Sequence, residues 1–140
     1  MVQRMYEILE HPADEKFHAE GSTREEAFSE AVEAFAEVVG GQTEGEYTHS
    51  IEIQSENLEA LLYDFLDELI FLQDSESIVV SHAKSLSFEE LENGYEIKAE
   101  LFTDVITADM SLLDIKAPTY NEMKVDYRDE KWVLEAVLDV

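Results

Sequence analysis

The sequence predicts an α+β fold in which two α-helices pack on a mainly antiparallel β-sheet. Two segments carry apolar residues at helical spacing, and most of the remaining chain has the character of short strands. The pair Asn93-Gly94 is a strong signal for a turn between antiparallel strands. The 140 residues contain 45% hydrophobic residues and only two prolines and five glycines. We therefore expect one domain spanning residues 1–140.

The first third of the chain predicts two strands followed by a helix. Residues 6–9 and 16–20 are expected to form short strands. Ser22 then begins a capping-box pattern, in which the Ser22 hydroxyl accepts a hydrogen bond from the Glu25 amide and the Glu25 side chain reaches back. The apolar residues that follow recur at intervals of three and four, which predicts a helix to about Val39.

A strand and a second helix are expected next. Residues 47–54 alternate in part between apolar and polar side chains, which is typical of a strand. Asn57 is a suitable cap for a helix over residues 58–73. This helix has a broad apolar face, so we expect it to be the more buried of the two.

The rest of the chain is expected to be mostly extended. Strands are predicted at residues 78–82, 84–91, 95–103, 118–127 and 131–139. Asn93-Gly94 predicts a type I′ turn between the second and third of these segments. The segment Arg128-Asp129-Glu130 is expected to connect the last two, whereas residues 110–115 have no clear pattern.

The charge of the chain is extreme, with 34 acidic residues against 9 basic residues and a net charge of −25. Such a surface repels nucleic acid phosphates, so direct RNA or DNA binding is not expected. An anionic membrane surface is disfavoured for the same reason. Basic protein partners and divalent cations are favoured. High solubility or adaptation to salt would explain the same charge without any specific partner.

Several classes of protein are disfavoured by what the sequence lacks. It contains no cysteine, hence no disulfide, thiolate metal site or cysteine nucleophile. It has no glycine-rich phosphate loop, Gly-x-Ser-x-Gly elbow or His-Glu-x-x-His motif. No apolar run approaches the roughly 18 residues that cross a bilayer, and residues 1–6 do not resemble a signal peptide. We expect a cytoplasmic protein without a catalytic apparatus of its own.

The most informative segment is Leu138-Asp139-Val140, where an acidic side chain ends an apolar run. A buried strand that stops at Asp139 brings oxygen-rich groups to its end, and Asp14 lies near the other end of the sequence. If the fold joins the two ends, their oxygens could form a site for a hard cation such as Ca²⁺ or Mg²⁺. The ordinary alternatives are a solvated chain end and a turn-forming aspartate.

Four other residues are candidates for a role at the same site. Asp64 and Glu68 are four residues apart and share a helix face, where acidic residues are usually just solvated. His11 could be a ligand or a base, although a single histidine more often has a structural role. Lys116 could contact a partner's nucleotide or phosphate, although an ordinary salt bridge is the commoner arrangement.

Four segments together give the chain a resemblance to a known family. They are Glu10-His11-Pro12-Ala13-Asp14, the acidic and apolar segment Leu61 to Asp74, Lys116-Ala117-Pro118-Thr119-Tyr120, and Val137-Leu138-Asp139-Val140. In order and spacing they resemble the archease family, small acidic proteins associated with the RtcB-type RNA ligase of tRNA splicing. Pro12 and Asn121 depart from the family pattern, which usually has Thr and His at these positions.

The resemblance implies a set of ligands and a role. Asp14, Asp139 and the main-chain or terminal oxygen of Val140 are implied to bind a divalent cation, commonly calcium. A further acidic position is implicated in the family, and Glu68 and Asp64 are the candidates for it. The implied role is non-enzymatic: the protein helps the ligase become guanylylated and turn over repeatedly, while the ligase joins the RNA ends.

Two other functions are compatible with the same residues. Carboxylates with a bound cation can activate water, as in a metal-dependent phosphohydrolase, although few basic residues are present to bind a phosphate substrate. A general chaperone or interaction module is the second alternative. The sequence leaves open the oligomeric state, and whether the metal is structural or takes part in nucleotide loading.

Overall fold

The computed structural model describes residues 5–9 and 14–140, and this part of the chain forms seven strands and two helices. In chain order these are β1 (Tyr6–Leu9), β2 (Asp14–Gly21), α1 (Arg24–Val39), β3 (Tyr47–Ser55), α2 (Leu58–Ser75), β4 (Ile78–Leu91), β5 (Gly94–Val105), β6 (Ala117–Arg128) and β7 (Lys131–Asp139). The α+β class with antiparallel strands is confirmed. No helix within the described residues is long and apolar enough to span a bilayer.

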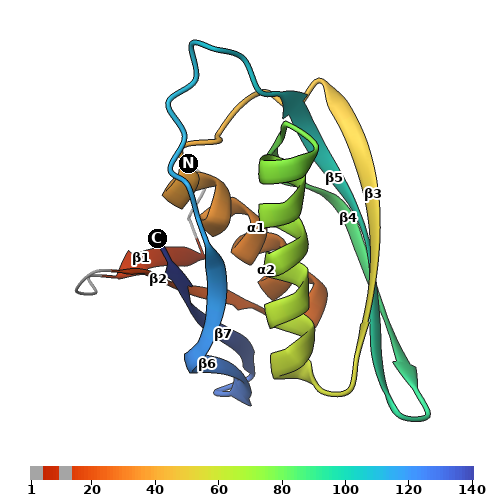
Figure 1. Ribbon diagram of the computed structural model, residues 1–140. Helices are drawn as coiled ribbons and strands as arrows, with labels where there is room; N and C mark the ends of the chain where they lie inside the picture. Colours follow the sequence, from red (N-terminus) through yellow and green to blue (C-terminus); the bar gives the residue numbers. More distant parts are fainter. Residues whose placement is uncertain (1–4, 10–13) are drawn as a thin grey trace.

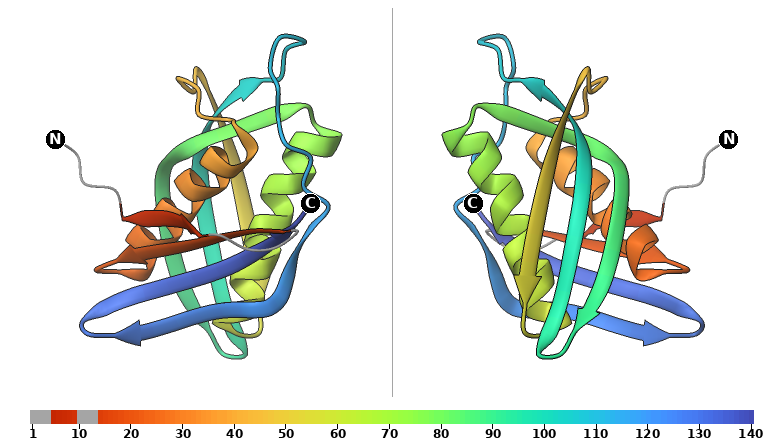
Figure 2. Two further views of the ribbon diagram at one scale, coloured as in Figure 1. Left: turned by 90° about the vertical axis from the view of Figure 1, so that its left-hand side faces the viewer. Right: turned by 90° about the vertical axis from the view of Figure 1, so that its right-hand side faces the viewer.

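The strands form two sheets, and the two helices lie between them (Figure 1). One sheet has the order β1-β2-β7-β6 and the other the order β3-β5-β4, with every neighbouring pair antiparallel. Helix α1 packs against β2 and β4, and α2 packs against β6, β3 and β4. The side views in Figure 2 show the helices held between the sheets. The sequence predicted one sheet; two form because the helices bury apolar side chains toward both sides.

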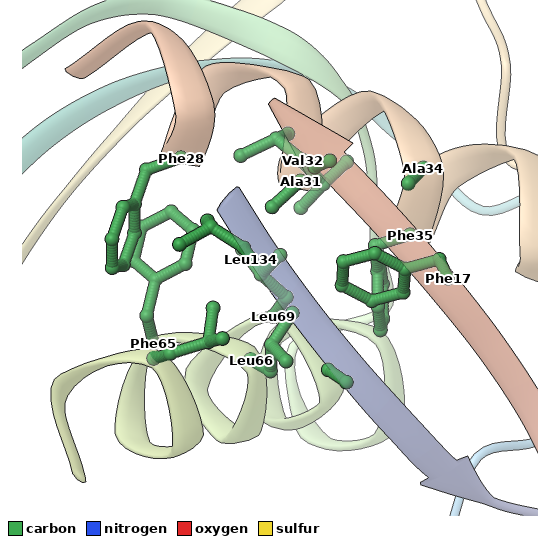
Figure 3. Packing of buried hydrophobic residues seen from close by; sticks show 14 of the residues in the cluster. Phe17, Phe28, Ala31, Val32, Ala34, Phe35, Phe65, Leu66, Leu69 and Leu134 are labelled. Carbon is green, nitrogen blue, oxygen red and sulfur yellow. The ribbon is translucent and has the colours of Figure 1, made fainter. Parts of the chain in front are cut away.

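The core between the layers is largely aromatic and aliphatic. The Phe28 ring of α1 meets the Phe65 ring of α2 edge-on at 5.6 Å and the Phe88 ring of β4 at 4.9 Å. Figure 3 shows Phe17 of β2 and Leu134 of β7 among these core side chains. Both residues are fully buried, so the β2–β7 pair is anchored to the core by the inner face of each strand.

The cap of α1 differs by one residue from the sequence prediction. Thr23, not Ser22, is the N-cap, and its hydroxyl accepts a hydrogen bond from the Glu26 amide at 3.1 Å. The Glu26 carboxylate in turn accepts from the Ser22 amide at 2.9 Å. Both residues fit the capping pattern, but β2 continues to Gly21 and leaves Ser22 in the turn. The predicted Asn57 cap of α2 is confirmed by a 2.8 Å bond to the Ala60 amide.

The predicted hairpin forms between β4 and β5, but Asn93-Gly94 is not a type I′ turn, because Asn93 does not have a positive φ. Positive φ angles at two adjacent turn residues occur at Asp129 (52°) and Glu130 (63°), between β6 and β7. In the β4–β5 hairpin Leu91 pairs with Gly94, which has a φ of 158°. A Cβ atom at Gly94 would lie 2.3 Å from the Ser55 carbonyl oxygen, so this glycine permits close approach of β3.

Two strand predictions are refined by the structure. The segments predicted separately at 78–82 and 84–91 are one strand, β4, with register irregularities between Val80 and His82 and between Ala83 and Ser85. These irregularities explain why the apolar alternation is interrupted in the sequence. Residues 110–115 form no strand and belong to the connection between β5 and β6.

Candidate metal site where the chain ends meet

The strands that carry the two candidate aspartates, β2 and β7, are antiparallel neighbours in one sheet. Asp14, the first residue of β2, is the direct partner of Asp139, the last residue of β7. Side chains of directly opposed residues in an antiparallel pair lie on the same face, with Cβ atoms about 4.5–5.5 Å apart. The two carboxylates therefore lie on one face of the sheet, at the end of its two inner strands.

The position of Asp139 is fixed from both sides because β7 lies between β2 and β6. Leu134, Ala136 and Leu138 are fully buried, which holds the apolar run of β7 against the helices. On the other side Ala117 of β6 pairs with Asp139, and the Lys116 amide donates to the Asp139 carbonyl oxygen at 2.8 Å. The main-chain carbonyl of Asp139 is thus part of the sheet, and its exposed carboxylate is left to face solvent.

The donor chemistry at these strand ends suits a hard cation. Like charges directly opposite one another in a sheet are destabilising, and a divalent cation between Asp14 and Asp139 would relieve that repulsion. Carboxylate and main-chain oxygens are ligands that Ca²⁺ and Mg²⁺ prefer, whereas Zn²⁺ prefers nitrogen and sulfur. Val140, half-buried against the core cluster, brings further oxygens to the same end.

The described residues contain no group of three or more His, Cys, Asp or Glu side chains that could hold a metal ion. Any third protein donor beside Asp14 and Asp139 in that part of the chain would thus be another kind of oxygen, such as a main-chain oxygen of Val140. Metal binding itself stays a prediction.

The other candidate residues lie in different settings. Asp64, in the second turn of α2, accepts a 2.6 Å hydrogen bond from the Ser55 hydroxyl at the end of β3. Glu68 is half-buried one turn later on the same helix. Neither joins Asp14 and Asp139 in a three-residue acidic group within residues 5–9 and 14–140. Lys116 is exposed and adjoins the site through its main chain. His11 lies outside the described residues.

Sequence reasoning missed a charged network farther along the same ladder. His18 lies between two carboxylates, with its Nδ1 atom 2.8 Å from Glu135 and its Nε2 atom 2.9 Å from Glu20. Lys16 lies 3.1 Å from Glu122 and 4.0 Å from Glu135, and Lys131 lies 3.4 Å from Glu20. The alternation of Lys16, His18 and Glu20 with buried Phe17 and Ala19 was the signal that could have revealed this face.

The two carboxylates change the acid–base behaviour of His18. Burial by itself would lower the pKa of His18, but hydrogen bonds to Glu135 and Glu20 and the charges of both outweigh it and raise the pKa. The hydrogen bond from His18 also lowers the pKa of Glu20. Both ring nitrogens can donate at once only when the imidazole is protonated, so the geometry favours an imidazolium ion.

The fold and these strand ends define a small acidic α+β protein with two opposed aspartates where its ends meet. Comparison with known proteins identifies its family. Residues 6–140 match the Archease protein family (MTH1598/TM1083), so the chain belongs to the archease family. The protein archease of Pyrobaculum neutrophilum is 35% identical over 140 residues, covering 96% of this chain and 95% of its own. That of Thermococcus kodakarensis is 35% identical over 142 residues, covering 98% and 99%.

Two solved structures have the same fold. The solution structure of Methanobacterium thermoautotrophicum protein 1598 has a TM-score of 0.82 at 27% identity, covering 99% of this chain and 100% of its own. The crystal structure of a Thermotoga maritima protein described as an archease and possible chaperone has a TM-score of 0.59 at 19% identity, with 94% of each chain covered. The second likeness concerns the fold alone.

Proposed function

We propose that this protein activates an RtcB-type tRNA-splicing RNA ligase, promoting guanylylation of the ligase and its multiple turnover. In this role the protein is not itself an enzyme, and it acts in the cytoplasm through a divalent-cation-dependent acidic site. Membership of the archease family supports the proposal. The observation that carries the cation-dependent part is the direct pairing of Asp14 with Asp139.

The residues at the joined ends would have distinct parts in this activity. Asp14 and Asp139 would hold the cation through their carboxylates, with Val140 supplying a main-chain or terminal oxygen. When bound, a calcium ion supplies positive charge that offsets the repulsion between the carboxylates. The Lys116 amide keeps Asp139 in place through the Asp139 carbonyl oxygen. The paired ends of β2 and β7 would thereby be held in one arrangement for contact with the ligase.

The net charge of −25 supports an RNA-binding enzyme as the partner rather than RNA itself. A surface of this sign repels phosphates and is attracted to the basic surface of a nucleic-acid-binding protein. Complementary potentials accelerate such encounters and make them sensitive to salt. The rate of activation should therefore fall as ionic strength rises.

The proposal is tested by guanylylation of the cognate ligase with and without this protein, in calcium and in chelator. We expect stimulation by the wild-type protein in calcium, and loss of stimulation in chelator and in Asp14→Asn and Asp139→Asn. Asp126→Asn is the matched control, because Asp126 is an exposed aspartate on the same face of the same sheet, paired with Val133. Full stimulation by the folded Asp139→Asn protein in chelator would remove the cation from the mechanism.

Two further assays separate the alternatives. Turnover of phosphoesters by the isolated protein, lost in Asp14→Asn, would instead indicate a metal-dependent phosphohydrolase. Suppression of aggregation of unrelated proteins, with no effect on the ligase, would indicate a general chaperone. Because the Thermotoga maritima protein with this fold is described as a possible chaperone, the second assay is the more informative of the two.

A further inference from the structure

A pair of stacked tyrosines lies on the solvent side of α2 and β6. The rings of Tyr63 and Tyr120 are 4.4 Å apart and nearly parallel, with an interplanar angle of 8°. Tyr120 is 57% exposed although it packs on Tyr63. It stands at the start of the irregular stretch of β6 between Thr119 and Lys124, where pairing with β7 is interrupted. The stack therefore leaves an aromatic surface open to solvent beside the helix.

The surroundings of this surface are negatively charged. Partial burial, followed by the negative charges of Asp64, of the ionised Tyr63 hydroxyl and of Glu56, raises the pKa of Tyr120. Asp64 directly follows Tyr63 in α2, and Glu56 precedes the Asn57 cap of the same helix. Asp67, exposed one turn beyond Tyr63, adds a further negative charge on the same face of α2. An open aromatic ring among carboxylates attracts a cation through both the ring and the charges.

The same protein contains a filled example of this arrangement. The Arg24 guanidinium lies over the rings of Phe88 at 5.3 Å, Tyr95 at 5.7 Å and Trp132 at 5.7 Å. The carboxylate of Glu90 lies 3.5 Å from the same guanidinium. The chain thus stabilises one of its own arginines with aromatic faces and a carboxylate.

The Tyr63–Tyr120 stack has no such arginine or lysine among the residues that the structure describes. Within residues 5–9 and 14–140, no lysine or arginine lies over the Tyr63 or Tyr120 ring, and none pairs with Asp64 or Glu56. The only hydrogen-bond partner that holds Asp64 there is the neutral Ser55 hydroxyl, so the negative charge is not offset.

We propose that the Tyr63–Tyr120 stack, with Asp64 and Glu56, is a docking site for an arginine side chain presented by a basic protein partner. Arginine fits better than lysine because its planar guanidinium can lie flat on the ring while it donates to a carboxylate. The partner is a protein rather than a nucleic acid, since phosphates would be repelled by Asp64, Glu56 and Asp67. The inference does not depend on cation binding by Asp14 and Asp139.

The test measures binding of a fluorescent peptide of alternating arginine and glycine, and of its lysine counterpart with the same length and charge. At about 0.15 M salt, where long-range attraction is screened, we expect tighter binding of the arginine peptide. Tyr120→Ala should weaken it roughly two- to fivefold and remove the preference for arginine. Tyr120→Phe should retain both, because the ring and not the hydroxyl forms the contact.

Tyr127→Ala is the matched control. Tyr127 is on the same strand and is 59% exposed, but its ring packs on Trp132 at the other end of β6. Asp64→Asn should weaken both peptides without removing the preference for arginine. Equal binding of the two peptides by the wild-type protein, or equal losses in Tyr120→Ala and Tyr127→Ala, would overturn the proposal. Self-association that is lost in Tyr120→Ala would also overturn it, by assigning the surface to a second copy of the chain.

Discussion

The outer face of the β2–β7 pair carries two opposite arrangements of charge within one ladder. At its end Asp14 faces Asp139, so two negative charges are directly opposed. Four residues along each strand, His18 faces Glu135, and the two are joined by a 2.8 Å contact. The second arrangement is what a sheet uses to stabilise itself. The first works against pairing, which is the property expected of a site that an added cation completes.

The Asp14–Asp139 pair and the His18–Glu135 pair lie on strands whose inner face packs on the same core. Removing a core side chain from that face should therefore destabilise both. Phe17 is fully buried, lies between Ile8 and Ala136 in the sheet, and is part of the core. Phe17→Ala should lower the free energy of unfolding by about 3–5 kcal/mol. Chemical denaturation measures this directly, and Phe71→Ala on the exposed side of α2 is the control with a small effect. A loss at Phe17 no larger than that at Phe71 would show that the sheet is not anchored there.

A lysine at position 14 would give the end of the β2–β7 ladder opposite charges, as at His18 and Glu135. Asp14→Lys would place a positive charge opposite Asp139 and replace the opposed like charges with a cross-strand pair worth about 0.2–1 kcal/mol in the metal-free protein. The same substitution should abolish stabilisation by calcium. With calcium at a hundred times its dissociation constant, the wild-type protein should gain about 2.7 kcal/mol, and the variant nothing.

Thermal unfolding with calcium and with chelator measures both effects. Asp126→Lys is the control for the added charge, since it lies on the same face away from the joined ends. Equal calcium stabilisation of Asp14→Lys and the wild-type protein would place the cation elsewhere.

The sequence predicted the local parts of this structure well and the long-range parts less well. The Asn57 cap and the end of α1 at Val39 depend on neighbouring residues, and both agree with the prediction. The charged pair His18–Glu135 joins residues 117 positions apart, so a local pattern could show that His18 lies on a charged strand face but could not identify its partner. An acidic residue that ends an apolar strand is unusual in itself, which singled out Asp139, but its direct pairing with Asp14 is long-range and comes from the fold.

The stability that His18 and its neighbouring carboxylates contribute should depend on pH. Because the pKa of His18 is raised in the folded state, its contribution to stability is fully present below the unfolded value of about 6.5. That contribution is lost as pH rises through the raised, folded pKa. The carboxylates around the His18 ring belong to Glu135 on β7 and Glu20 on β2. Glu7 on β1 pairs directly with His18, and Lys16 lies two residues before His18 on β2.

Denaturation across this pH range should show the wild-type protein losing stability relative to His18→Gln as pH rises. The difference between the two proteins should be the same in calcium and in chelator, since His18 is not part of the joined ends. A pH profile of His18→Gln that is parallel to the wild-type profile would contradict the assignment.

The smallest effect is expected for the ion pair between Lys131 and Glu20. The atoms are 3.4 Å apart, and the Lys131 side chain is 52% exposed. Lys131→Met should cost less than about 1 kcal/mol, because exposed ion pairs are screened by water and salt. Unfolding in low and high salt should show the difference vanish at high salt. A cost that persists in high salt would point instead to packing by the lysine stem.

Calcium titration followed by calorimetry is the most direct test of the claim that the two ends of the chain form a cation site. The wild-type protein and Asp126→Asn should show the same saturable binding, which should be lost in both Asp14→Asn and Asp139→Asn. Equal binding in all four proteins, or loss in only one of the two end variants, would contradict a site shared between β2 and β7.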